Sequence, residues 1–92
     1  MTTVKGRKWV VFECRAEVGA DVRVAGTFND WDPSQMKLKD KNGDGTFTTR
    51  LFLAPGRHEY KFIVNGNWSP DPSCQDSTPD GHGSVNSVIT VG

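Results

Sequence analysis

The stretch from residue 59 to residue 68 constrains the fold more than any other part of the chain. Its side chains alternate in the two-residue period of a β-strand, with Tyr60, Phe62 and Val64 on one face. The opposite face carries Glu59, Lys61, Ile63 and Asn65. A glycine-containing turn follows at once and is expected to bring Trp68 onto the surface near Lys61. The chain must therefore contain a sheet that buries the tyrosine face and exposes the lysine face.

The same two-residue period recurs along the chain, and no stretch has the period of a helix. Turn signals separate the alternating segments, among them Asn42–Gly45 and Ala54–Arg57. The expected strands cover 8–15, 21–27, a short 36–39, 46–53, 59–68 and 84–91, with loops at 28–33 and 69–83. This pattern predicts an all-β fold, an antiparallel β-sandwich of about seven strands.

The alternation also assigns side chains to the inside and the outside of the sandwich. Phe12 and Cys14 are expected in the core, whereas Trp9 is expected to pack on the outer face of the first strand. Phe52 and Val88 are expected to point outward. A glycine near the end of the second strand, Gly26, predicts a close backbone approach or a bulge.

Length and charge exclude several classes of protein. The 92 residues suffice for one domain, taken as 1–92, and the net charge of zero favours neither nucleic acid nor an anionic membrane as a partner. No apolar run approaches the roughly 20 residues of a membrane span, and no signal peptide is recognisable, so a cytoplasmic location is expected. Cys14 and Cys74 have neither metal-ligand spacing nor companion histidines; a disulfide between them is open on number alone.

The sequence contains little evidence for a catalytic or metal-binding site. The segment 40–45 matches the opening of a calcium loop, but Leu51 stands where a bidentate glutamate is needed, so a hairpin turn is the better interpretation. His58 and His82 have no recognisable nucleophile nearby. The acids of the 69–83 loop are interpreted as solvated side chains rather than as a catalytic pair. We therefore expect no enzyme activity, no metal and no cofactor.

Two tryptophans in turns carry a stronger signal. Trp31 and Trp68 lie in segments rich in Asn, Asp and Pro, away from the alternating core faces. They could simply cover the ends of the sandwich. Alternatively, an indole ring provides a flat apolar surface for the C–H face of a sugar, while Lys61, Asn65 and Asn67 can bond its hydroxyl groups. The second interpretation predicts a polysaccharide-binding surface.

Three blocks of sequence carry a resemblance to a known family. They are Ala25–Trp31, Leu53–Trp68 with Asp71 and Pro72, and Gly83–Ile89. Together they resemble carbohydrate-binding module family 48, which includes the glycogen-binding domains of AMP-activated protein kinase beta subunits and domains that precede the barrels of branching and debranching enzymes. The resemblance extends over about residues 12–91. It implies an immunoglobulin-like, early-set β-sandwich.

The resemblance also implies a site and a function. Trp31 and Trp68 would stack on glucose rings, and Lys61 and Asn86 would bond the sugar hydroxyls. His82 stands where the glycogen-binding domains carry a leucine that reaches the sugar ring. The implied ligand is an α-1,4-linked glucan such as glycogen or starch, bound without catalysis. The alternative is a structural or protein-interaction domain that packs on a glucan-active enzyme, or on a kinase-type partner, without binding sugar.

Overall fold

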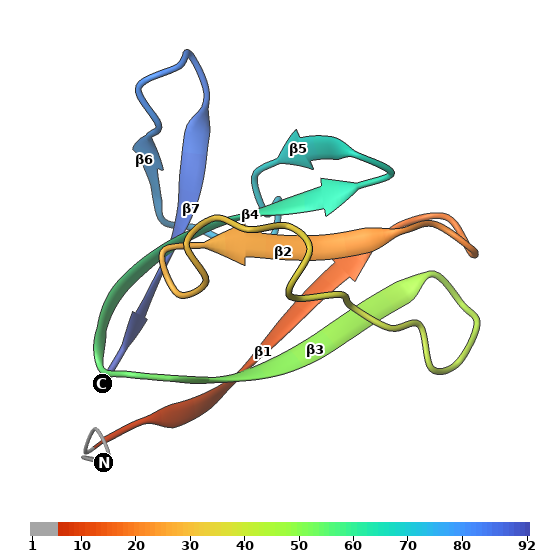
Figure 1. Cartoon of the computed structure of the whole chain (residues 1–92), viewed down its shortest axis with the longest axis horizontal. Coiled ribbons are helices and arrows are strands. Elements are labelled where there is room, and N and C mark those ends of the chain that lie inside the picture. The colour runs from red at the N-terminus through yellow and green to blue at the C-terminus, as the bar shows by residue number, and fades with distance from the viewer. Residues whose placement is uncertain (1–5) are drawn as a thin grey trace.

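Seven antiparallel strands make up the fold in the computed structural model, which describes residues 6–92 (Figure 1). In chain order they are β1 (Lys8–Arg15), β2 (Val22–Gly26), β3 (Thr46–Leu53), β4 (Gly56–Val64), β5 (Asn67–Ser69), β6 (Ser77–Pro79) and β7 (Val85–Val91). β1 pairs with β3 in one sheet, and the other sheet has the order β2-β4-β7-β6, with β5 paired to the end of β4. The sequence prediction of an all-β, antiparallel fold of about seven strands in two sheets is confirmed.

The core lies between the two sheets. Most of the side chains that alternation assigned to the inside of β1, β2, β3 and β4 are buried there, and Val10 and Val64 are partly buried against the same cluster. Phe12 meets Tyr60 edge-to-face with ring centroids 4.9 Å apart, which joins β1 of one sheet to β4 of the other. Because Tyr60 and Phe62 are fixed in this core, Lys61 between them faces the opposite side of the sheet.

The segment 36–39 connects the two sheets but is not a strand, contrary to the expectation. It forms two isolated bridges, one between Lys37 and Arg23 of β2 and one between Lys39 and Thr48 of β3. Leu38 lies between them and is 1% exposed. Since each bridge faces a different sheet, neither extends into a ladder, and the segment instead closes one side of the core.

The expected loop at 69–83 contains a short strand. Residues 77–79 form β6, which pairs with β7 from Ser77 opposite Ser87 to Pro79 opposite Val85. A strand of this length shows no periodicity in a sequence. Pro79, which cannot donate to a ladder, is tolerated because β6 is the last strand of the sheet order.

Side chains on the outer faces divide into two kinds. On the β1–β3 sheet, Trp9 and Phe52 are 62% and 45% exposed, as expected. Val88 on β7, expected to point outward into solvent, is 8% exposed. The 70–76 segment covers it, with the Val88 N–H donating to the Asp76 carbonyl and the Cys74 thiol donating to the Val88 carbonyl. Loops therefore cover part of the outer face of this sheet.

Cys14 and Cys74 are both free thiols, so the disulfide left open by the sequence is not present. Cys14 is buried in the core as expected, and burial raises the pKa of its thiol. No helix within residues 6–92 is long and apolar enough to cross a membrane.

Candidate functional site

A hollow of about 490 Å³ lies on the outer face of the larger sheet. Five of the residues singled out from the sequence line this first hollow: Trp31, Lys61, Trp68, His82 and Asn86. Thr27, Glu59 and Asp80 complete its lining. The sixth, Asn67, is exposed at the start of β5 and does not line it. Residues from four distant parts of the chain are thus brought to one concave surface.

Trp31 is held at the hollow by a tight loop after β2. Asp30 and Trp31 both have left-handed backbone conformations, with φ of 56° and 58°. Such a conformation costs on the order of 1–3 kcal/mol in a bulky residue and persists only where its surroundings impose it. The Trp31 N–H donates to the Gly26 carbonyl at 2.9 Å, which fixes the backbone of Trp31 relative to the end of β2.

Asn29 organises the same loop from inside. Its side chain is 6% exposed and accepts from the Gly26 N–H at 2.9 Å while donating to the Val24 and Asp32 carbonyls. Gly26 itself has no room for a side chain, because a Cβ there would lie 2.3 Å from the Glu59 carbonyl oxygen. The close approach predicted for this glycine is confirmed, and it lets β4 run directly beneath the Trp31 loop.

Lys61 projects from β4 into the floor of the hollow. Its Nζ donates to Oδ2 of Asp80 at 2.6 Å, and the side chains are 11% and 10% exposed. The ammonium group is therefore held in one place by a carboxylate instead of moving freely in solvent. An ammonium group has three N–H donors. Within residues 6–92 only one of them has a partner, so two are available to a ligand.

Asp80 also shapes the loop that carries His82. Its Oδ1 accepts from the backbone N–H groups of His82 at 2.7 Å and Ser84 at 3.2 Å. The bond from Lys61, together with these backbone bonds, lowers the pKa of the Asp80 carboxyl to about 2. The carboxylate is thus charged at neutral pH and positions both the lysine and the histidine loop.

Asn86 and Glu59 line the first hollow next to Lys61, on the paired strands β7 and β4. The Asn86 amide, on β7, donates to Oε1 of Glu59 at 3.1 Å, and Arg57 donates to the other carboxylate oxygen at 3.0 Å. Asn86 is 9% exposed, less than its outward position predicted, because the glutamate and the neighbouring loops cover it. Within residues 6–92 no side-chain hydrogen bond uses its amide oxygen, which can therefore accept from a ligand.

Trp68 stands at the rim. It lies on β5 directly opposite Ile63 of β4 and is 46% exposed. The hollow therefore has two aromatic rings at its edge, one ammonium group, two carboxylates and one amide. This combination offers apolar plates for ring stacking and donors and acceptors for hydroxyl groups.

Sequence reasoning missed the residues that position the others. Glu59 was placed on the correct face but was given no role, and Asp80 was interpreted as a solvated loop acid. Asn29 lies in the expected loop 28–33, and nothing in the sequence marks its side chain as buried. The spacing of Asp80 before His82 and Ser84 is typical of a side chain that caps its own loop, and this was the one available signal.

Other polar contacts are structural. The Asp40 carboxylate accepts from the backbone N–H groups of Asp44 and Gly45, as in a turn. Tyr60 donates to Asp71 at 2.7 Å, and burial with this bond raises the pKa of its hydroxyl. Within residues 6–92, no group of three or more His, Cys, Asp or Glu side chains is placed to hold a metal ion.

Comparison with known proteins decides the family. Residues 10–92 match the sequence model described as the glycogen recognition site of AMP-activated protein kinase. The chain belongs to this family. The resemblance inferred from the three sequence blocks is thereby confirmed.

Individual members of the family show the same relationship. The chain is 37% identical over 73 residues to 5′-AMP-activated protein kinase subunit beta-1 of Sus scrofa, which covers 79% of this chain and 56% of that protein. For beta-1 of Homo sapiens the identity is 37% over 79% of this chain and 25% of that protein. For beta-2 of Mus musculus it is 36% over 83% and 27%. The chain thus spans between a quarter and just over half of these relatives.

Proposed function

We propose that this domain binds α-1,4-linked glucan, such as glycogen, starch or maltooligosaccharides, in the first hollow. The observation that carries the proposal is the convergence of Trp31, Trp68 and Lys61 on one concave surface. The family model that matches the chain, described as a glycogen recognition site, supports it. In the proposed complex the two indole rings stack on glucose units, and Lys61, Asn86 and His82 contact the sugar hydroxyls.

The proposed affinity is weak. Two stacked rings contribute about 2–4 kcal/mol from apolar burial. The cost of ordering the ligand offsets part of this, so a single domain should bind in the micromolar-to-millimolar range. Weak binding suits a polymer with many equivalent sites, because several contacts along one chain act together. Asn67, outside the first hollow, would contribute only through a longer ligand.

The proposed role is binding without catalysis. The matching family is described as a recognition site, and the carboxylates of the hollow have structural partners: Asp80 holds Lys61, and Glu59 holds Asn86 and Arg57. A carboxylate engaged in this way is poorly suited to protonate a glycosidic oxygen. Incubation with glycogen followed by a reducing-end assay should give no product above the blank.

The binding proposal is tested by calorimetric titration with maltoheptaose and by retention on amylose. We expect saturable binding below about 10 mM and retarded elution, as weak affinities of this class imply. No heat at millimolar ligand together with unretarded elution would contradict it. Cellobiose, whose linkage has the opposite configuration, is the ligand control and should not bind measurably.

A second candidate function is supported by a different surface. Trp9, Val11 and Phe52 form an exposed apolar patch, the outer β1–β3 patch, on the smaller sheet, and Trp9 and Phe52 have ring centroids 5.0 Å apart. Under this alternative the domain packs on a glucan-active catalytic domain or a kinase-type partner, in the same chain or another. Self-association in sedimentation that Trp9→Ala abolishes and maltoheptaose leaves unchanged would favour this function.

We also propose a cytoplasmic location. Its support is the pair of free thiols, Cys14 and Cys74, which fit a reducing compartment. Reaction of the freshly isolated protein with a thiol reagent under denaturing conditions should label both cysteines.

A further inference from the structure

A second hollow of about 420 Å³ adjoins the first on the same sheet face. Trp68 lines both hollows, so its ring stands between them. We propose that the second hollow is an additional subsite for the same α-glucan, occupied by glucose units that continue past Trp68. This inference rests on the proposed function and concerns the length of glucan that the surface binds.

The two hollows share a floor. Along β4, Lys61 faces the first hollow and Ile63 the second, and Asn65, which follows the strand, also lines the second. Residues two apart on a strand face the same side and lie roughly 6–7 Å from each other. The floor therefore runs without interruption from one hollow to the next along a single strand.

The two hollows also share a wall. The loop after β2 places Trp31 at the first hollow and, a few residues further, Pro33 and Ser34 at the second. Pro33 and Trp68 give the second hollow an apolar surface, to which Ile63, only 4% exposed, adds little. A polymer that stacks on Trp31 and Trp68 can thus extend across Trp68 without leaving the concave surface.

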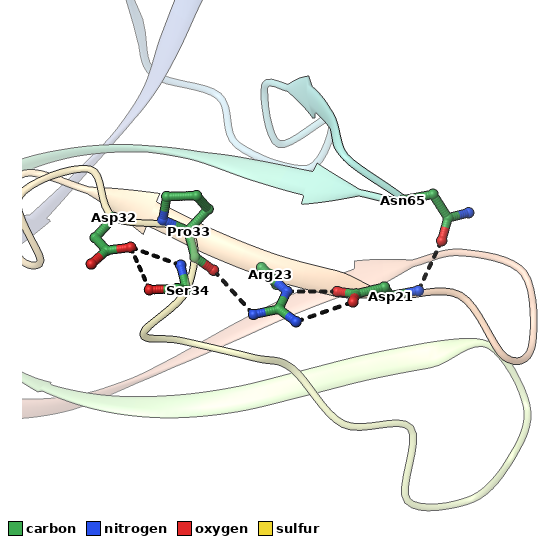
Figure 2. Close-up of polar contacts among 6 residues, drawn as sticks. All are labelled: Asp21, Arg23, Asp32, Pro33, Ser34 and Asn65. Atoms are coloured by element: carbon green, nitrogen blue, oxygen red, sulfur yellow. Dashed lines mark hydrogen bonds and ion pairs between the residues drawn. The ribbon is translucent and has the colours of Figure 1, made fainter.

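The polar group of the second hollow is an arginine–aspartate fork (Figure 2). Arg23 Nε donates to Asp21 Oδ1 at 2.8 Å and Nη2 donates to Oδ2 at 3.1 Å, while Nη1 donates to the Pro33 carbonyl at 3.5 Å. A guanidinium group has five N–H donors. Three of them bond to residues within 6–92, which leaves two for a ligand. Figure 2 shows the Arg23 guanidinium between the Pro33 carbonyl on one side and the Asp21 carboxylate on the other.

The fork is held before any ligand arrives. The Asp21 N–H donates to Oδ1 of Asn65 at 2.9 Å, and the Asn65 N–H donates to the Asp21 carbonyl at 2.8 Å. Asn65 has a φ of 51° and begins the turn that carries Trp68. These two bonds therefore tie the fork to the Trp68 turn, and little order must be gained on binding.

The chemistry of the fork favours a neutral ligand. Asp21 balances the charge of Arg23, so a phosphate or carboxylate gains no net attraction from the pair. The remaining N–H donors and carboxylate lone pairs can instead bond adjacent sugar hydroxyls, which both donate and accept. A polar fork in the same hollow as the apolar surface of Pro33 and Trp68 suits a further glucose unit.

The test compares oligosaccharides of two lengths in wild type, Arg23→Gln and the control Arg50→Gln, which lies on β3 of the other sheet. Calorimetry should show maltoheptaose binding more tightly than maltotriose in the wild type. Arg23→Gln should weaken maltoheptaose binding about three- to tenfold, the effect of one or two lost hydrogen bonds, and leave maltotriose binding unchanged. Arg50→Gln should change neither affinity.

Amide chemical shifts provide a second readout in the wild type. Maltotriose should shift Thr27 and His82, and maltoheptaose should in addition shift Ser34 and Gly66. Equal affinities for the two ligands, or the same loss for both in Arg23→Gln, would overturn the second subsite while leaving the proposed function intact. Absence of binding by either ligand in the wild type would overturn both.

Discussion

Nζ of Lys61 lies 2.6 Å from Oδ2 of Asp80, with both side chains about nine-tenths covered. This contact joins the middle of β4 to the loop that precedes β7. It therefore connects the strand that forms the floor of the first hollow to the loop that carries His82. The same carboxylate receives the backbone N–H groups of His82 and Ser84. Asp80 therefore sets the shape of the proposed glucan site without needing to touch a sugar.

Replacing Asp80 by asparagine should destabilise the domain at neutral pH, because an amide cannot pair with the lysine charge. We expect a lower Tm at pH 7 for Asp80→Asn and no change for Asp76→Asn on the same loop. The folded-state pKa of Asp80 lies below its ordinary value, at about 2. The stabilisation is thus complete above about pH 4 and is lost as pH falls toward about 2, so the Tm difference should vanish over that interval. A difference that persists unchanged at pH 2 would contradict this assignment.

Removing Trp68 should weaken glucan binding more than removing Trp31. Trp68 lines both hollows, whereas Trp31 lines only the first. Trp68→Ala should reduce maltoheptaose affinity about tenfold or more, the loss expected from about 1.5–3 kcal/mol of apolar contact. The control is Trp9→Ala, an exposed tryptophan of the other sheet, which should bind like the wild type. Equal losses for Trp31→Ala and Trp68→Ala, measured by calorimetry, would contradict the ordering.

The side chain of His82 should limit affinity. Because Asp80 bonds the His82 backbone, a substitution changes the side chain without releasing the loop. His82→Leu should bind maltoheptaose about fourfold more tightly, the gain from burying roughly one more CH₂ equivalent. His82→Ala is the matched variant and should bind no better than the wild type. If leucine and alanine give the same affinity, His82 does not contact the ligand.

Asn29 should matter for stability. Its buried side chain makes three hydrogen bonds within the Trp31 loop. Asn29→Ala should lower the free energy of unfolding by about 2–3 kcal/mol, measured by urea denaturation, since buried backbone groups lose their partners. Asn67→Ala, at an exposed position, should change it by less than about 0.5 kcal/mol. A similar effect for both would mean that the loop does not depend on Asn29.

The strands could be predicted because their alternation covers enough residues to be seen. β1, β3 and β7 have nearly the expected bounds, and the Tyr60 face of β4 is the buried one. β6 could not be predicted, since its three residues are too few to show a period. Val88 was assigned to solvent for a related reason: the sequence does not reveal that the 70–76 segment folds back over β7.

The candidate site was predictable in its aromatic and outward-facing parts. Trp31 and Trp68 could be predicted from the Asn-, Asp- and Pro-rich segments around them, although Trp68 lies on the short strand β5 and not in a turn. Lys61 could be predicted from its place between two core residues. The polar contacts that fix them were not, because each depends on residues far apart in the chain: Lys61 with Asp80, and Asn86 with Glu59. The second hollow could not be predicted, because in the sequence Arg23 and Asp21 are typical of an exposed ion pair. Only the fold places the turn before Trp68 beside them.

The most direct test of glucan binding in the first hollow is a titration of the ¹⁵N-labelled domain with maltoheptaose, followed by amide and indole chemical shifts. We predict saturable shifts at Trp31, Lys61 and Trp68, with similar apparent Kd values, and none at Trp9 or Phe52 of the outer β1–β3 patch. Absence of saturable shifts at millimolar maltoheptaose, or shifts confined to Trp9 and Phe52, would contradict it.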